Sequence, residues 1–157
     1  MRRSFVKLGV LKQFSTRRTR TEIEHLGLFA VLHASSVLEQ RVEARLAEVN
    51  LSLAKLAALC HLTRAGDSLP LGHLAERLAC VKSNVTQLVD RLEADGLVTR
   101  SHDPGDRRSR LAVLTDKGRQ VCALGSEIRH RAERELFGAL AADELLELRR
   151  LLAKLTS

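Results

Sequence analysis

The segment from Pro70 to Leu114 constrains the fold more than any other part of the chain. Two short amphipathic helices are predicted there, over 71–78 and 82–94, and only residues 79–81 separate them. Gly96 follows the second helix, at the position where a left-handed helix cap favours glycine. So tight a junction between two short helices is typical of a helix-turn-helix.

The pattern then changes from helical to extended. Short β-prone runs over 97–100 and 111–114 flank residues 103–110, which are rich in turn-forming side chains. We expect a β-hairpin here, and its loop carries three arginines: Arg107, Arg108 and Arg110. A helix-turn-helix followed directly by such a hairpin predicts a compact DNA-binding unit, in which the arginines reach the minor groove or the backbone.

Longer helices flank this unit. Thr21 and Glu24 have the spacing of a capping box at the start of a helix that ends near Asn50. One face of that helix is apolar at Ile23, Leu26, Ala30, Ala34, Leu38, Val42, Leu46 and Val49. Ser52 is expected to open a second helix, and Thr115 to cap a long one that runs to about 137. A last helix from about Ala142 is apolar at Leu145, Leu148, Leu152 and Leu155. The fold class is therefore mainly α with a small β-hairpin.

The exposed side of the helix over 82–94 is the candidate site for reading DNA. Short polar side chains near a helix N-terminus approach base edges in the major groove closely. The predicted DNA-binding residues are Lys82, Ser83, Asn84, Thr86, Gln87 and Arg91 on this helix, with Arg107, Arg108 and Arg110 on the loop. Asp106 is expected to pair with a nearby arginine and hold it in position. A merely solvated helix face is the alternative for this helix taken alone.

These motifs resemble the winged helix of MarR-type transcription regulators. The resemblance rests on LAERL at 74–78, KSNVTQLVDRLE at 82–93 and DGLV at 95–98, then on DPGDRR at 103–108 and LTDKGR at 114–119. It implies an obligate homodimer, with two winged lobes that bind a near-palindromic operator in double-stranded DNA. It also implies that a small-molecule effector or an oxidant releases the DNA, as from a repressor.

The resemblance extends more weakly over 21–157, which we treat as one domain after a basic arm at 1–20. Residues of about 52–115 then form the winged helix-turn-helix lobe, and about 21–50 and 116–157 form the dimerisation helices. Four positions depart from the family pattern. Ala79 and Val81 stand where the family usually has glycine and a capping serine, Gln87 where many relatives carry arginine, and Ala141 where the last helix usually has its cap.

The net charge of +7 belongs almost wholly to the arm. Residues 1–20 contain seven bases and no acid, so the body at 21–157 holds 19 bases and 19 acids. The arm lacks the uninterrupted apolar centre of a secretory signal. A solvated tail, an organellar transit peptide, and an arm that contacts DNA phosphates or a partner subunit all remain open. No apolar run approaches the roughly 20 residues that span a bilayer, so no membrane partner is expected.

Cysteine and histidine residues are the sensor candidates. Cys80 lies in the predicted turn, and a small buried hydrophobic role competes with a redox switch there. Cys60 and Cys122 are assigned the buried role, and three widely spaced cysteines favour a reducing cytoplasm over a disulfide framework. His25, His33 and the pair Cys60-His61 show no convergence toward one metal ion. We therefore expect no metal and no cofactor.

The composition excludes several functions. With phenylalanine as its only aromatic residue, at four positions, the chain cannot build the stacking surfaces of single-strand binders. It contains no phosphate-binding glycine loop and no nucleophile elbow, so an enzyme is not expected. A sequence-specific transcription regulator is the first prediction. The alternative is a winged-helix interaction protein or a non-specific DNA-binding protein.

Overall fold

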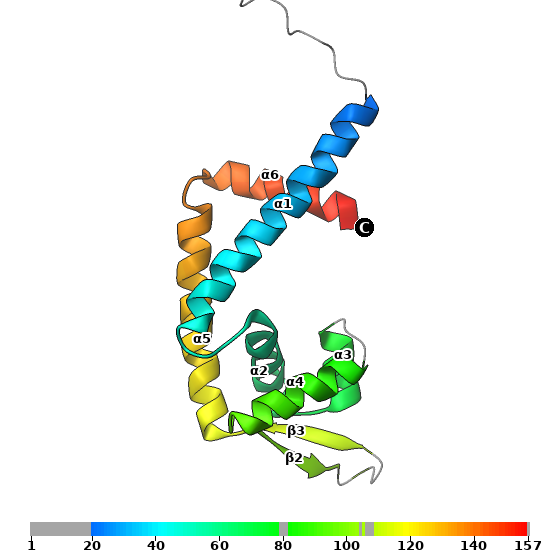
Figure 1. Ribbon diagram of the computed structural model, residues 1–157, viewed down its shortest axis with the longest axis vertical. Coiled ribbons are helices and arrows are strands. Elements are labelled where there is room, and N and C mark those ends of the chain that lie inside the picture. The colour runs from blue at the N-terminus through cyan, green and yellow to red at the C-terminus, as the bar shows by residue number, and fades with distance from the viewer. Residues whose placement is uncertain (1–19, 79–81, 104, 106–108, 157) are drawn as a thin grey trace, which may run out of the picture. The chain divides into compact units, whose positions relative to one another are not determined.

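The computed structural model describes residues 20–78, 82–103, 105 and 109–156. Helices and strands follow one another in this order: α1 (Arg20–Ala47), α2 (Leu53–Arg64), β1 (Ser68–Pro70), α3 (Leu71–Arg77), α4 (Lys82–Ala94), β2 (Val98–His102), β3 (Arg110–Leu114), α5 (Asp116–Phe137) and α6 (Ala142–Thr156) (Figure 1). The chain divides into two compact units, Met1–Val37 and Leu38–Ser157, and the second holds every element from α2 to α6. The expected fold class, mainly α with a small antiparallel sheet, is confirmed.

The ends of α2 and α4 follow directly from local sequence. Ser52 caps α2, since its hydroxyl accepts a hydrogen bond from the Lys55 amide at 3.2 Å, as expected. Gly96 has a φ of 70°, which glycine adopts without steric cost. The Gly96 amide donates to the Glu93 carbonyl at 2.9 Å and the Leu97 amide to the Leu92 carbonyl at 2.8 Å. These two bonds form the Schellman cap that the glycine predicted.

The expected capping box at the start of α1 is wrong. The helix already includes Arg20, so Thr21 lies inside the helix and not at its N-cap. Thr21 and Glu24 have the right spacing for a cap, but spacing alone does not locate the first turn, because the preceding residues also decide whether the helix continues.

The sheet contains one strand more than the expected hairpin. Its order is β1-β3-β2, and both neighbouring pairs are antiparallel. In the hairpin, Val98 pairs with Leu114 and His102 pairs with Arg110. In the additional pairing, Ser68 pairs with Val113 and Pro70 with Leu111. Strand β1 has only three residues, too few for the sequence to show an alternating pattern, and it pairs with β3 along one edge.

The core lies among α2, α3, α4, the sheet and the adjoining parts of α1 and α5. The largest fully buried side chains are Leu46, Leu59, Leu62, Leu74, Leu92, Val85, Val89 and Val98. The apolar face expected on α4 is confirmed at Val85, Val89 and Leu92. Because α4 and the hairpin share this core, the packing sets the position of the exposed face of α4 beside the wing.

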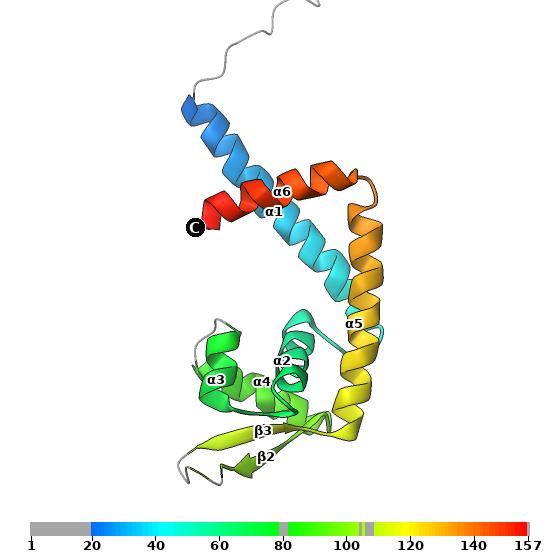
Figure 2. The ribbon, with the colours of Figure 1, turned by 180° about the vertical axis from the view of Figure 1, so that it is seen from behind.

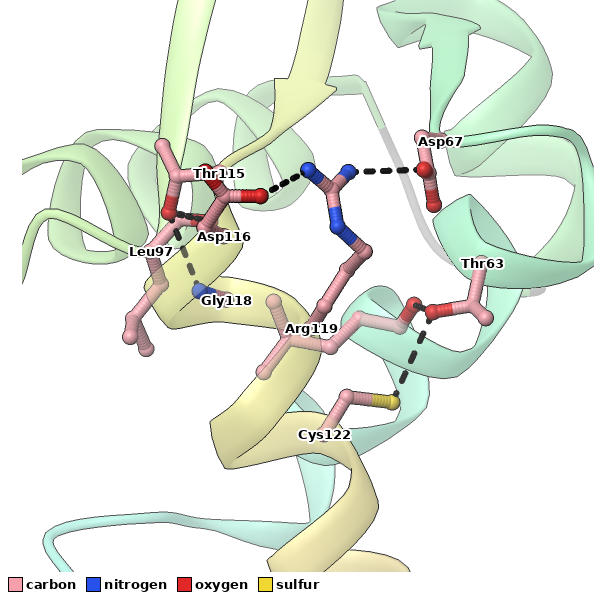
Figure 3. Close-up of polar contacts among 9 residues, drawn as sticks. Thr63, Asp67, Leu97, Thr115, Asp116, Gly118, Arg119 and Cys122 are labelled. Atoms are coloured by element: carbon pink, nitrogen blue, oxygen red, sulfur yellow. Dashed lines mark hydrogen bonds and ion pairs between the residues drawn. The ribbon is translucent and has the colours of Figure 1, made fainter.

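Side chains at the start of α5 bond to residues outside the helix. Thr115 caps it, since its hydroxyl oxygen accepts from the Gly118 amide at 3.0 Å and donates to the Leu97 carbonyl at 3.1 Å. Figure 3 shows Arg119 lying between Asp67 and Asp116, and its Nη1 is 2.7 Å from Oδ2 of Asp67. The cap expected at Thr115 is therefore confirmed, and the hydroxyl makes a second contact outside the helix.

Replacing Gly118 with alanine is expected to destabilise the fold. An added Cβ would overlap the Leu97 carbonyl oxygen and lie 2.8 Å from Cδ1 of Leu114, so α5 would have to move away from the sheet. Overpacking of this kind typically costs about 1–3 kcal/mol. Chemical denaturation measures it, and Gly72→Ala on α3 is the matched control because its Cβ meets no atom within 4 Å. Equal stability of both variants would contradict the packing described.

Large apolar side chains remain exposed on the first and last helices. On α1, Val42 and Leu46 of the expected face are buried, whereas Leu26 is 49% exposed. Helix α6 buries none of its residues, and Leu146, Leu151 and Leu155 are all exposed. Exposed apolar faces such as that of α6 normally have a partner in solution. No helix among the described residues is both long and apolar enough to cross a membrane.

Candidate nucleic-acid interface

Helix α4 presents a polar face opposite its buried one. Ser83, Asn84, Thr86, Gln87 and Arg91 are all exposed, as the predicted role of each requires. Lys82 begins the helix. Cys80 and the departures at Ala79 and Val81 lie outside the described residues. Small hydroxyl, amide and guanidinium groups on one exposed face provide both hydrogen-bond donors and acceptors for base edges.

The wing is formed by β2 and β3 (Figure 1), and Figure 2 shows the same two strands from behind. Arg110 is exposed at the start of β3, opposite His102. The Asp103 amide donates to the Ser109 carbonyl at 3.2 Å, and the Asp103 carboxylate accepts from the Gly105 amide at 2.9 Å. The predicted residues Asp106, Arg107 and Arg108 lie outside the described residues. Arg110 therefore marks where the predicted arginine loop returns to the sheet.

Arg100 on β2 links the wing to α4. Its Nη1 donates to Oε2 of Glu93 at 2.7 Å, and its backbone amide donates to Oε1 of the same carboxylate at 3.2 Å. Its Nη2 contacts Asp90 Oδ1 and the Thr86 carbonyl, the latter at 3.3 Å. A fork-shaped guanidinium suits several acceptors at once. The side chain is 23% exposed, so these bonds are partly shielded from water.

This network also changes the charge of the predicted DNA-facing helix. Asp90 and Glu93 would repel phosphates, but Arg100 lies against both carboxylates. Asp95, at the end of the same helix, pairs with Lys55 Nζ at 2.6 Å. With all three acids paired, the exposed base Arg91 meets less opposing charge near DNA.

Arg100 is a candidate site residue that the sequence pattern alone does not identify. Helical spacing places Asp90 on the exposed face of α4, but the spacing alone assigns no partner to it. The sequence does contain a signal for this pairing, because Arg100 lies in the hairpin shortly after the helix that carries Asp90 and Glu93. The pairing depends on how β2 folds back along α4, which spacing alone does not determine.

Replacing Arg100 with glutamine is expected to weaken operator binding roughly tenfold, because two carboxylates on the DNA-facing helix would lose their counter-charge. Titration of a labelled operator fragment measures the change. Arg100→Lys should retain part of the affinity, since it keeps the charge but not the fork. Adding Asp90→Asn and Glu93→Gln to Arg100→Gln should restore much of the operator affinity that Arg100→Gln loses. If the triple variant binds no better than Arg100→Gln, the loss is structural and the electrostatic explanation is wrong.

The structure describes the side chains of the metal candidates His33, Cys60 and His61. Among the residues that the structure describes, no three histidine, cysteine or acidic side chains are arranged to hold a metal ion. His61 is half-buried on α2, and its burial together with Arg64 and Arg77 lowers its pKa below the usual value. That shift favours a neutral imidazole at pH 7. Cys60 and Cys122, by contrast, lie close to each other.

The geometry defines the class of protein. Two short helices ending in α4, followed by the β2–β3 hairpin and bridged by Arg100, form a winged helix-turn-helix lobe. The sequence model of the MarR family matches residues 51–109, which is this lobe without its last strand. Among solved structures, a MarR family transcriptional regulator from Streptomyces coelicolor, Sco5413, is 30% identical, with a TM-score of 0.75. The similarity covers 85% of this chain and 93% of Sco5413. The chain belongs to the MarR family of transcription regulators.

Two further comparisons bear on the site. A mutant MarR from E. coli complexed with operator DNA is 26% identical, with a TM-score of 0.76 over 85% of this chain and 96% of that one. The uncharacterized HTH-type transcriptional regulator YkoM of Bacillus subtilis (strain 168) is 38% identical over 84 residues. That match covers 54% of this chain and 54% of YkoM, so it spans only about half of this relative.

Proposed function

We propose that this protein is a homodimeric, sequence-specific regulator of transcription that binds double-stranded DNA, and that it acts as a repressor. The observation that carries the proposal is the exposed polar face of α4, held beside the wing by Arg100. Each copy would place α4 in the major groove and the wing against the adjacent minor groove or backbone. The operator complex of the E. coli relative supports DNA as the partner.

The homodimer is supported by the apolar faces of the outer helices. The exposed leucines of α6 provide apolar area of the kind that an obligate dimer buries. Leu28, Phe29 and Leu32 on α1 are exposed as well. A second copy of the chain would supply the matching face, because a two-fold interface joins identical patches. Two lobes related by such an axis account for a near-palindromic operator.

Release by a small-molecule effector is the second part of the proposal. A pocket of about 370 Å³ lies between the end of α1 and α5, lined by Arg41, Ala44, Arg45, Ala132, Glu135 and Leu136. Its size is within the usual range for small ligands. Arg45 pairs with Glu135 at 3.1 Å, whereas Arg41 offers a charge suited to an acidic ligand. A transcription regulator needs access to the genome, and we therefore propose that the protein acts in the cytoplasm.

The competing function is a winged-helix protein that binds DNA without sequence preference, or binds another protein. The polar face of α4 argues against it, because amide and hydroxyl groups offer directional bonds to bases, while non-specific binding needs only positive charge.

A competition assay separates the two functions. The full chain is titrated onto a labelled fragment of its own upstream region, with unlabelled fragment or unrelated DNA of equal length as competitor. The regulator proposed here should require about 10³-fold more unrelated DNA than specific DNA for equal displacement. Equal competition by the two DNAs would favour the non-specific alternative and contradict the proposal.

A further inference from the structure

Two cysteines that are far apart in the sequence meet in the structure. Cys60 on α2 and Cys122 on α5 place their Sγ atoms 3.6 Å apart, although 62 residues separate them along the chain. The sequence predicts a separate buried role for each cysteine, and nothing in their spacing predicts that they are neighbours. No disulfide joins them, and both are free thiols.

The surroundings of the two thiols differ. Cys60 is half-buried, with its Sγ 3.6 Å from the Ser126 hydroxyl, whereas Cys122 is only 6% exposed. Thr63 donates its hydroxyl to the Cys122 sulfur at 3.7 Å, a contact drawn in Figure 3. Burial raises the pKa of the Cys122 thiol, so Cys122 stays protonated while Cys60 is the more accessible of the two.

We propose that Cys60 and Cys122 form a dithiol site that a hydroperoxide oxidises to a disulfide between α2 and α5, and that this bond lowers the affinity for DNA. The effect on DNA rests on the proposed function, whereas formation of the disulfide does not. The site is contained within one chain.

The chemistry balances with a hydroperoxide as the only oxidant. Cys60 loses its proton to water, and its thiolate attacks the outer peroxide oxygen. The O–O bond breaks, the alcohol or water leaves with a proton from water, and Cys60 becomes a sulfenic acid. The Cys122 sulfur then attacks the Cys60 sulfur, the S–O bond breaks, and hydroxide leaves with the Cys122 proton as water. Two thiols have then given two electrons to one hydroperoxide.

Closing this bond must disturb the packing of α2 on α5. The sulfur atoms would move from 3.6 Å to about 2.05 Å apart. The helices are already in close contact one turn away, since a Cβ added at Gly125 would lie 2.6 Å from Cδ1 of Leu51 and 2.9 Å from Cδ1 of Leu56. The helices have little room to approach there, so we expect closure of the bond to turn the two cysteine side chains and to shift α2. Because α2 shares the core with α4, a shift of α2 moves the DNA-facing helix relative to the wing.

The test uses the full chain, first reduced and then treated with hydrogen peroxide or cumene hydroperoxide. Free thiols are blocked with iodoacetamide, and the digested protein is analysed by mass spectrometry without reduction. We expect a cross-linked peptide pair containing Cys60 and Cys122. Cys80→Ser is the matched control and should still form the cross-link, whereas Cys60→Ser should not. Cys122→Ala provides a second loss variant in case serine in the core prevents folding.

Operator titration then compares the reduced and the oxidised protein. We expect the affinity to fall about tenfold on oxidation, to recover with dithiothreitol, and to be insensitive to peroxide in Cys60→Ser. A cross-link through Cys80, or sulfonic acid without a cross-link, would overturn the dithiol site. A complete Cys60–Cys122 disulfide with unchanged affinity would overturn its effect on DNA. If the reduced protein binds no specific DNA at all, the proposed function is wrong. The peptide masses still show in that case whether Cys60 and Cys122 form the disulfide.

Discussion

Removing the three wing arginines together, by changing Arg107, Arg108 and Arg110 to alanine, is expected to lower operator affinity by about 100-fold or more. Each guanidinium that meets phosphate or enters the minor groove releases counterions and gains charge-assisted hydrogen bonds. The slope of log K against log salt should become shallower by up to about three units. Fluorescence anisotropy with a labelled operator at several salt concentrations measures both quantities.

The basic arm provides a control matched in charge. Changing Arg2, Arg3 and Lys7 to alanine also removes three positive charges, but from a segment that is not predicted to contact specific bases. This variant should weaken binding to operator and to random DNA in equal proportion, so its specificity ratio should not change. The wing variant should lose more affinity for operator than for random DNA. Operator affinity that is unchanged in the wing variant would contradict the docking scheme.

The second large effect is expected at the predicted dimer interface. Changing both Leu151 and Leu155 on α6 to glutamate would place two unpaired carboxylates in the proposed apolar interface, where burying each charge costs several kcal/mol. We expect the protein to become monomeric, and operator affinity to fall by about 100-fold because only one half-site is then held. Sedimentation equilibrium gives the mass, and the same anisotropy titration gives the affinity.

A charge change elsewhere on α6 separates this effect from general destabilisation. Arg149→Glu introduces a negative charge on the same helix at an exposed position that is not apolar, and it should leave the protein dimeric. Circular dichroism should show that both variants keep their helices. A leucine variant that sediments as a dimer would contradict the assigned interface.

Local signals in the sequence predict much of this fold. Ser52 and Thr115 cap the helices they precede, and Gly96 ends α4, because each effect depends on residues within one helical turn. The helical spacing of the apolar residues on α4 likewise predicts which of its faces is buried. In all these cases the determining contacts are close in the sequence.

Contacts between residues that are far apart in the sequence could not be predicted from local patterns. Strand β1 depends on pairing with β3, about 40 residues later, and the Cys60–Cys122 contact spans 62 residues. The Arg100 network joins residues that are close in sequence, yet it needs the hairpin to fold back onto α4. No periodicity encodes such pairings, because they depend on the packed arrangement of whole elements.

The net charge of the chain likewise says little about where the charged side chains lie. Residues 81–110 hold six bases and five acids, so the lobe is formally almost neutral. The structure pairs Asp90 and Glu93 with Arg100, and Asp95 with Lys55. Arg91 and Arg110 stay exposed on α4 and on the wing. We expect that this pairing of the acids, more than the net charge, allows the surface to bind DNA.

Selection of bound sequences from a random pool of double-stranded DNA tests the central claim most directly. The account predicts enrichment of a near-palindrome, with two half-sites whose centres lie about 10 base pairs, or a multiple of that, apart. Gln87→Ala should change the preferred base at symmetric positions in both half-sites. A pool that shows no enriched motif, or an asymmetric motif that is the same for the wild type and for Gln87→Ala, would contradict a dimer that reads DNA through α4.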